Sequence, residues 1–512
     1  MKIAAKDFTP GALFVRGTLC AAAALLTLTA AHAQDAASPS AQRRPGTTVR
    51  IELIGDSTQT DNAGYGRGFC ANFTDKVDCV NMAKGGASTR TFREQGLWDR
   101  GLATQPDYML IQFGHNDMET PEHLDRQVPM AQYEENLRRF VREAREHHIT
   151  PILVTPLTRR YFEADGKIHS DLLAHAATMK RVADELKVPL IDLQAESIAY
   201  LDKLGEAEGT KLGITKKDPT GKTIPDKTHL NWAGSYAFGR IVAVDLGKVQ
   251  PQLARYVRPT PAELPDEGRL AMRVIRGEPF KIVLVGDSTV AEGGGWGPGF
   301  CATLTPNVTC IDDARNGRSA KSFIDEGLWK KALDEKGQYY FIQFGHNDQK
   351  DDPARHGDAG GSYDEYLRRY IRETRAIGAI PIIVTSLSRR TFKDGALAED
   401  GLRQYAAAAK HVAAEEKVTC VDLFSMSQAL LKTMTQEQAD TFDAETHPDA
   451  KAENTTTAKD RTHLNDKGKA VFGRMVADNV IRTQVELGPN VNGVPTTTAT
   501  PGVRPSAPTG GK

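Results

Sequence analysis

The chain has 512 residues, a length that suits two or three domains better than one. Its 65 basic and 66 acidic residues nearly cancel, which argues against nucleic acid as the main partner because a phosphate-binding surface needs an excess of positive charge. The hydrophobic share of 40% supplies enough apolar side chains for the packed cores of ordinary soluble domains.

The N-terminus has the pattern of a cleavable export signal. Basic residues precede an apolar stretch over 17–30, and the small residues Ala31-His32-Ala33 offer a cleavage site. This stretch is shorter than the roughly 20 residues that cross a bilayer, so a membrane anchor is the weaker interpretation. The sequence predicts a signal peptide over 1–33, a flexible segment over 34–47, and a secreted or periplasmic protein with no membrane contact after the signal is removed.

A repeat with an offset of 231 residues organises the rest of the chain. Its period is far longer than the 20–50 residues of solenoid repeats, so it indicates two whole domains. The matched segments are 54–58 and 285–289, 68–70 and 299–301, 96–98 and 327–329, 111–117 and 342–348, and, at an offset of 234, 226–231 and 460–465. We predict one domain over 48–258, a proline-containing linker over 259–277, a second domain over 278–487, and a disordered tail over 488–512.

Within each copy, short apolar runs alternate with helical patterns. In the first copy, Val49–Ile54, Met109–Phe113, Pro151–Thr155 and Pro189–Leu193 are predicted to be buried strands, and Tyr133–Glu146 places its apolar residues on one helical face. This alternation predicts an α/β layer fold with a parallel sheet. In such folds ligands bind at the carboxyl ends of the strands.

The cysteines follow the repeat. Cys70 and Cys79 are nine residues apart, as are Cys301 and Cys310. In an exported chain this spacing suggests one disulfide in each domain, and two buried free thiols in each domain remain the alternative. Cys420 lies in an apolar run and is predicted to be a core residue.

The repeated segments carry the groups needed for acyl transfer. Ser57 follows the first predicted strand and opens a helix, where backbone N–H groups can bind an anion. Serine becomes a nucleophile when a base takes its proton; His229 is such a base, and Asp226 stands three residues before it to orient the imidazole. Gly86 and Asn116 are suitable donors to an oxyanion. The second copy repeats the set as Ser288, Gly317, Asn347, Asp460 and His463.

Each of these signals is weak by itself. Gly-Asp-Ser is common in turns, and Asp-x-x-His is equally a surface pair or half of a metal site. His115 and its counterpart His346 are also shared, and we expect them to pack or to support the neighbouring asparagine. What carries the argument is that nucleophile, glycine, asparagine and Asp-x-x-His recur twice in the same order.

These four blocks resemble those of the SGNH hydrolases, also called the GDSL family. The resemblance covers both domains and implies two tandem three-layer α/β/α domains, similar to flavodoxin, with parallel sheets. It implies that Ser57 and Ser288 attack an ester carbonyl, that His229 and His463 act as base and then acid, and that no metal or other cofactor is needed.

The second copy is similar to the rhamnogalacturonan acetylesterase branch of that family, through its segments 295–297 and 313–319. That branch removes acetyl groups from pectic polysaccharide, so the implied substrate is an acetylated polysaccharide or oligosaccharide. Tyr65 and Trp296 are expected to stack on sugar rings. Arg318 is expected to hold a uronic carboxylate, which Ala87 in the first copy cannot do.

This difference predicts that the second domain favours acidic pectic chains and that the first is more tolerant or prefers neutral or shorter fragments. The alternative for Arg318 is an ion pair with a nearby acid such as Asp312 or Asp313. Two other functions remain open for the chain: a lipase or thioesterase of the same superfamily, and a carbohydrate-binding module in which one copy has lost activity.

Overall fold

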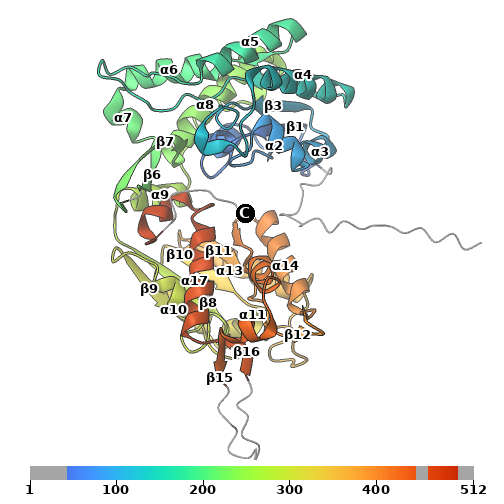
Figure 1. Cartoon of the computed structure of the whole chain (residues 1–512), viewed down its shortest axis with the longest axis vertical. Coiled ribbons are helices and arrows are strands. Elements are labelled where there is room, and N and C mark those ends of the chain that lie inside the picture. The colour runs from blue at the N-terminus through green and yellow to red at the C-terminus, as the bar shows by residue number, and fades with distance from the viewer. Residues whose placement is uncertain (1–42, 219, 446–458, 494–512) are drawn as a thin grey trace, which may run out of the picture. The chain divides into compact units, whose positions relative to one another are not determined.

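The structure is a computed structural model, and it describes residues 43–218, 220–445 and 459–493. In Figure 1 the first domain runs from blue to green along the chain, and the second runs from yellow-green to red. The predicted signal peptide, and the part of the predicted tail beyond residue 493, lie outside the described residues. Among the residues that are described, no helix combines the length and the apolar character needed to cross a bilayer.

The first domain is built on a five-stranded sheet with the order β2-β1-β3-β4-β5, in which every neighbouring pair is parallel. Its strands are β1 (Val49–Gly55), β2 (Val77–Asn81), β3 (Tyr108–Gln112), β4 (Thr150–Val154), β5 (Leu190–Ile191), and the separate antiparallel hairpin β6 (Gly213–Lys217) and β7 (Thr223–Leu230). Its helices are η1 (Ser57–Gln59), α1 (Gly66–Ala71), α2 (Thr89–Glu94), α3 (Leu97–Ala103), η2 (Pro121–His123), α4 (Met130–Glu146), α5 (Leu173–Leu186), α6 (Leu193–Leu204), α7 (Glu206–Thr210), α8 (Trp232–Val249) and η3 (Pro251–Tyr256).

Both faces of this sheet are buried. Since successive side chains of a strand point to opposite faces, one strand contributes to two core clusters. On β3, Met109 and Ile111 join a core cluster with α2, α3, α4 and α5, whereas Leu110 joins a second cluster with α1, α6 and α8. These two clusters are the two interfaces of a helix–sheet–helix sandwich, so the predicted three-layer α/β fold with a parallel sheet is confirmed.

The second domain repeats this architecture with the sheet order β14-β11-β10-β8-β9. Its strands are β8 (Phe280–Gly286), β9 (Val308–Asp312), β10 (Tyr339–Gln343), β11 (Ile380–Val384), β14 (Thr419–Val421), and the short pairs β12 (Phe392–Lys393) with β13 (Ala396–Leu397) and β15 (Asp443–Glu445) with β16 (Lys459–Leu464). Its helices are α9 (Asp266–Ile275), α10 (Gly297–Cys301), α11 (Ala320–Asp325), α12 (Leu328–Asp334), α13 (Ser362–Ala376), α14 (Leu402–Glu415), α15 (Leu423–Leu431), α16 (Gln436–Asp440), α17 (Asp466–Val480) and η4 (Val485–Asn490).

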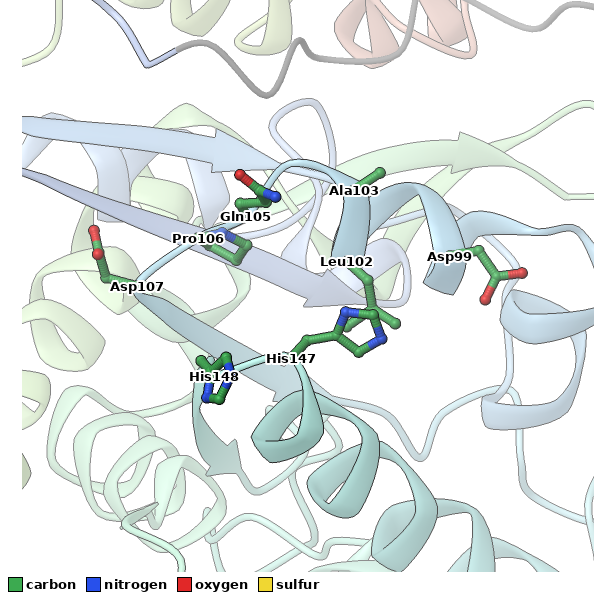
Figure 2. A pocket seen from close by; sticks show the side chains of 8 residues that line it. All are labelled: Asp99, Leu102, Ala103, Gln105, Pro106, Asp107, His147 and His148. Atoms are coloured by element: carbon green, nitrogen blue, oxygen red, sulfur yellow. The ribbon is translucent and has the colours of Figure 1, made fainter.

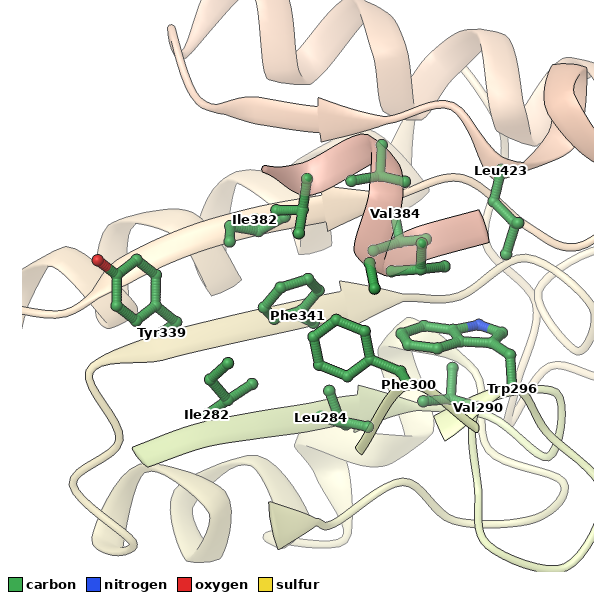
Figure 3. Packing of buried hydrophobic residues seen from close by; sticks show 14 of the residues in the cluster. Ile282, Leu284, Val290, Trp296, Phe300, Tyr339, Phe341, Ile382, Val384 and Leu423 are labelled. Atoms are coloured by element: carbon green, nitrogen blue, oxygen red, sulfur yellow. The ribbon is translucent and has the colours of Figure 1, made fainter. Parts of the chain in front are cut away.

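One core cluster of the second domain is drawn in Figure 3. Phe341 of β10 and Leu284 of β8 lie on either side of Phe300 in this view, next to Trp296; Phe300 belongs to α10 and Trp296 directly precedes that helix. The ring centroids of Phe300 and Phe341 are 4.8 Å apart. This cluster therefore joins the first helix after Ser288 directly to the centre of the sheet.

The predicted linker differs from the structure. Residues 266–275 form α9, a helix that starts directly after Pro265 and buries Leu270 and Val274 in the core cluster of the second domain. Proline is well tolerated at a helix start, so the prolines of this segment delimit the helix instead of excluding it. The tail predicted over 488–512 also begins too early, because η4 continues to Asn490 and Val491 is buried in the same cluster.

Both predicted disulfides are present. Cys70 of α1 is bonded to Cys79 of β2, and Cys301 of α10 is bonded to Cys310 of β9. Each bond joins the first α-helix after the Gly-Asp-Ser segment to the edge strand of its sheet. Cys420 is a free cysteine in β14, and its side chain is partly buried against the neighbouring core cluster.

Removing the second disulfide by the double change Cys301→Ala, Cys310→Ala is expected to lower the free energy of unfolding of the second domain by about 2–3 kcal/mol. The reason is that a short closed loop restricts the unfolded chain. Urea unfolding of the variant and the parent measures the loss. Peptide mapping without reduction is the control, and free thiols at Cys70 or Cys301 in the parent would contradict the pairing.

Candidate active site

The nucleophile candidate of the first domain stands where β1 ends. Asp56 caps the short helix η1, because its Oδ1 accepts hydrogen bonds from Thr58 N (2.9 Å) and Thr58 Oγ1 (2.7 Å). Gly55 passes so close to β3 that a Cβ would lie 2.5 Å from the carbonyl oxygen of Gln112. The turn is therefore tightly set, and it holds Ser57 just beyond the carboxyl end of β1.

His229 meets Ser57 from a different element. It lies near the end of β7, and α8 begins just after it, capped by Asn231, whose Oδ1 accepts from Gly234 N. His229 Nε2 is 3.0 Å from Ser57 Oγ, and His229 Nδ1 is 3.1 Å from Asp226 Oδ2. The structure thus brings a hydroxyl, an imidazole and a carboxylate from distant parts of the sequence into one hydrogen-bonded row.

The second domain holds the same row at shorter distances. His463 Nε2 is 2.7 Å from Ser288 Oγ, and His463 Nδ1 is 2.6 Å from Asp460 Oδ2. Burial acts to raise the pKa of Asp226, but hydrogen bonds and the charge of His229 hold that pKa below its usual value. The pKa of Asp460 is lowered in the same way. Each carboxylate is therefore ionised and able to orient its imidazole.

The candidate oxyanion donors also lie at this edge. Gly86 and Gly317 have φ angles of 79° and 76°, a left-handed conformation that favours glycine. Asn116 Nδ2 donates to the carbonyl oxygen of Ala87 (3.0 Å), and Asn347 Nδ2 donates to that of Arg318 (3.0 Å). Since each Nδ2 carries two hydrogens, one stays available for a ligand.

His115 lies on the buried side of the nucleophile turn. Its Nδ1 is 3.3 Å from Asp56 Oδ2, and in the second domain His346 Nδ1 is 3.6 Å from Asp287 Oδ2. Burial acts to raise the pKa of Asp56, but the charge of His115 holds it below its usual value. The histidine therefore supports the turn that presents Ser57.

Tyr65 and Trp296 are not available to a sugar. Both are 0% exposed, so the expectation that they stack on substrate is wrong. Tyr65 precedes α1 and Trp296 precedes α10, and this position turns each side chain into the interface between helix and sheet. Trp296 Nε1 donates to Gln343 Oε1 (2.8 Å), whose Nε2 donates to Thr289 Oγ1 (2.6 Å). The buried indole is thus connected through Gln343 to Thr289, the residue after Ser288.

Arg318 forms an ion pair on the surface of the second domain. Its Nη2 lies 2.8 Å from Glu326 Oε2, and its Nη1 donates to the carbonyl oxygen of Asn316 (2.9 Å). The alternative of an ion pair with a nearby acid therefore describes this residue, although the partner is Glu326 and not Asp312 or Asp313. Its charge is already paired on this surface.

Two buried arginines, Arg160 and Arg390, hold the acid–base segments and were not singled out from the sequence. Arg160 Nη2 donates to the carbonyl oxygens of Asp226 (2.8 Å) and His229 (2.6 Å), and so holds both ends of the acid–base segment. Arg390 Nη2 donates likewise to the carbonyl oxygen of His463 (2.8 Å). The signal was present, since an Arg-Arg pair follows the same strand in both copies, at 159–160 and at 389–390.

The two arginines are buried in different ways. Arg390 forms a fully buried ion pair with Asp443, a residue that lies opposite Leu464 in the β15–β16 pair. In the first domain the residue opposite the equivalent Leu230 is Gly213, so Arg160 has no carboxylate at that position. A Cβ at Gly213 would lie 2.4 Å from Arg160 Nη2, so the guanidinium fills that space. Burial lowers the pKa of Arg160 to about 10.

The change Arg160→Met, made in a Ser288→Ala background, is expected to lower kcat of the first domain by about 10–100-fold, because the acid–base segment loses its anchor and His229 shifts from Ser57. KM should change much less. Esterase kinetics and a thermal unfolding curve are measured together. Arg145→Met is the matched control, since exposed Arg145 also donates to a backbone carbonyl, that of Leu186. Loss of stability with an unchanged kcat would contradict a positioning role.

No group of three or more His, Cys, Asp or Glu side chains suited to a metal ion occurs within the described parts of the chain. A pocket of about 570 Å³ lies on the first domain, lined by residues 105–107, which precede β3, and by His147 and His148 after α4 (Figure 2). It lies at the amino ends of the strands, whereas Ser57 follows the carboxyl end of β1. This pocket is therefore separate from the catalytic groups.

Two segments of the chain match the same protein family. The family model described as "GDSL-like Lipase/Acylhydrolase family" matches residues 50–237 and again residues 284–471. The chain belongs to this family. Both matched ranges contain their own serine, glycine, asparagine and Asp-x-x-His groups, and the chain is a carboxylic ester hydrolase of the SGNH type.

Several relatives are similar to part of the chain. The rhamnogalacturonan acetylesterase RhgT of Bacillus subtilis (strain 168) is 35% identical over 209 residues, which cover 38% of this chain and 88% of that protein. The probable rhamnogalacturonan acetylesterase YesY of the same organism is 30% identical over 201 residues, covering 38% and 90%. Among solved structures, YxiM of Bacillus subtilis has 28% identity and a TM-score of 0.34; the match covers 40% of this chain and 57% of that one.

Proposed function

We propose that this protein is a carbohydrate O-acetylesterase that removes acetyl groups from pectic polysaccharide of the rhamnogalacturonan type, and that both domains catalyse the reaction. The observation that supports this most directly is the hydrogen-bonded row of serine, histidine and aspartate in each domain. The substrate class is supported by the 35% identity to an enzyme named rhamnogalacturonan acetylesterase.

In the first half of the reaction, Ser57 Oγ attacks the carbonyl carbon of the acetyl ester while its proton passes to His229 Nε2, 3.0 Å away. The backbone N–H groups of Ser57 and Gly86 and the Asn116 amide donate to the oxyanion of the tetrahedral intermediate. When the intermediate collapses, the bond to the sugar oxygen breaks, and His229 returns the proton to that oxygen. The products are a free sugar hydroxyl and an acetyl-serine.

In the second half, His229 takes a proton from water, and the resulting hydroxide attacks the acetyl-serine. When the second intermediate collapses, the bond between the acetyl carbon and Ser57 Oγ breaks, His229 gives its proton to Ser57 Oγ, and acetate is released. Asp226 stabilises the imidazolium formed in each half. In the second domain the corresponding groups are Ser288, Gly317, Asn347, Asp460 and His463.

The test of this function is release of acetate from acetylated rhamnogalacturonan, xylan and pectin, with the wild type and with each serine variant. Short and long p-nitrophenyl esters are compared in parallel, because a lipase or thioesterase would prefer the long acyl chain. Acetate release from rhamnogalacturonan with a preference for p-nitrophenyl acetate supports the proposal. Hydrolysis of long-chain esters without acetate release from any polysaccharide contradicts it.

We further propose that the protein is exported after cleavage near residue 33. Two disulfides are consistent with an oxidising compartment, because cytosolic thiols are kept reduced. N-terminal sequencing of the mature protein tests this proposal. A mature protein that still begins at Met1 would contradict it.

A further inference from the structure

A positively charged side chain stands beside the oxyanion glycine of the first domain. A Cβ built on Gly86 would lie 3.0 Å from Arg126 Nη1, and a Cβ built on the preceding Gly85 would lie 3.9 Å from Ser57 Cβ. Arg126 comes from the segment between η2 and α4. Ser57 and the Arg126 guanidinium thus flank the same two-glycine segment.

The Arg126 side chain is largely buried, and its guanidinium is weakly paired. The Arg126 side chain is 13% exposed, and its Nε lies 3.3 Å from Asp125 Oδ1, on a side chain that is 65% exposed. Neither Nη atom has a hydrogen-bond partner among the described residues. Both Nη groups are therefore free to donate in parallel to a carboxylate, which is the two-pronged contact that the planar fork of an arginine favours.

The second domain places the corresponding arginine differently. Arg355 N donates to the carbonyl oxygen of Asp352 as Arg126 N does to that of His123, but Arg355 Nε is paired with Asp352 Oδ2 at 2.6 Å and the Arg355 side chain is 35% exposed. Nothing lies within 4 Å of a Cβ built on Gly317, and Arg318 is paired with Glu326. The nearby Lys350 donates from Nζ to Asn347 Oδ1 (2.7 Å). A lysine is a hydrated point charge and cannot form the two-pronged contact of an arginine with a carboxylate.

We propose that Arg126 is a specificity-determining residue of the first domain and that its Nη groups bind a carboxylate of the substrate. That carboxylate belongs to the acetylated sugar or to its neighbour, because Arg126 lies just across Gly85 and Gly86 from Ser57. The inference rests on the proposed function. It makes the first domain the one that favours acidic saccharides, the reverse of what Arg318 and Ala87 suggest from the sequence.

The test uses the full chain with Ser288→Ala, so that only the first domain is active. The substrates are acetylated galacturonate oligosaccharides with free carboxylates and the same oligosaccharides with methyl-esterified carboxylates. Arg126→Ala is expected to lower the ratio of kcat/KM for the free form over the methyl-esterified form by about tenfold, mostly through KM. Arg126→Lys should restore part of that ratio. Arg142→Ala, a change of an exposed arginine paired with Glu135, should leave it unaltered.

A second pair of substrates separates this inference from the proposed function. 4-Acetoxybenzoate and its methyl ester differ only in the carboxylate and contain no sugar. If the oligosaccharides are not hydrolysed but Arg126→Ala still lowers the ratio for the benzoates, the carboxylate site stands and the carbohydrate function fails. If Arg126→Ala and Arg126→Lys leave both ratios unchanged, the inference about Arg126 is overturned.

Discussion

The double change Ser57→Ala, Ser288→Ala is expected to lower ester hydrolysis by a factor on the order of 10⁴–10⁶, because it removes both nucleophiles and leaves only binding and oxyanion stabilisation. Each single change should leave the activity of the other domain intact. The measurement is the initial rate of p-nitrophenyl acetate hydrolysis by all four proteins. The proposal that both domains are active depends on this comparison.

A serine change on the surface provides the control. Ser425 is exposed on α15, and Ser425→Ala should keep full activity. If Ser57→Ala or Ser288→Ala alone already abolishes hydrolysis, the other domain is silent and the two-domain proposal is wrong.

Loss of the oxyanion amide has the next largest expected effect. In a Ser57→Ala background, Asn347→Ala is expected to lower kcat by roughly 10²–10³, as for other single oxyanion donors, with a much smaller change in KM. The geometry supports this, since Asn347 Nδ2 is oriented by its bond to the carbonyl of Arg318, and Asn347 Oδ1 accepts from Lys350 Nζ. Steady-state kinetics on p-nitrophenyl acetate provides both constants.

The matching variant in the first domain is Asn116→Ala in a Ser288→Ala background. Because Asn116 makes the same bond to a backbone carbonyl, a similar fall in kcat is expected. Thermal unfolding of each variant shows whether the fold is retained. A fall below about threefold in a folded variant would remove the asparagine from the mechanism.

The fold and the catalytic groups were accessible from the sequence for a physical reason. Strands buried on both faces are continuous apolar runs, and the predicted strand Val49–Ile54 corresponds to β1 with one further residue. The catalytic groups were recognisable because duplication presents the same chemistry twice at fixed spacing. Neither signal depends on knowing which loops lie together.

The features that the sequence analysis missed depend on distant contacts. The pattern of β2 (Val77–Asn81) was overlooked because that edge strand is only partly buried and mixes polar with apolar residues. Tyr65 and Trp296 were taken for ligand contacts, since the sequence does not say on which side of a helix start a side chain points. Arg126 and Arg355 occupy equivalent positions in their loops, but these loops lie outside the matched segments of the repeat, so the repeat gave no hint of either residue.

The helix α9 limits where the chain can be cut. Leu270 and Val274 lie in the same core cluster as Phe280, and Glu267 pairs with Arg375 Nε at 3.1 Å. A truncated protein that began at Glu278 would lack α9 and would expose to water the core residues that this helix covers. The second domain would lose about 1.5–3 kcal/mol of stability for each large apolar side chain whose burial is lost. Dissection of the duplicated enzyme into halves should therefore cut before Pro265, so that the second half keeps its own cover and remains soluble.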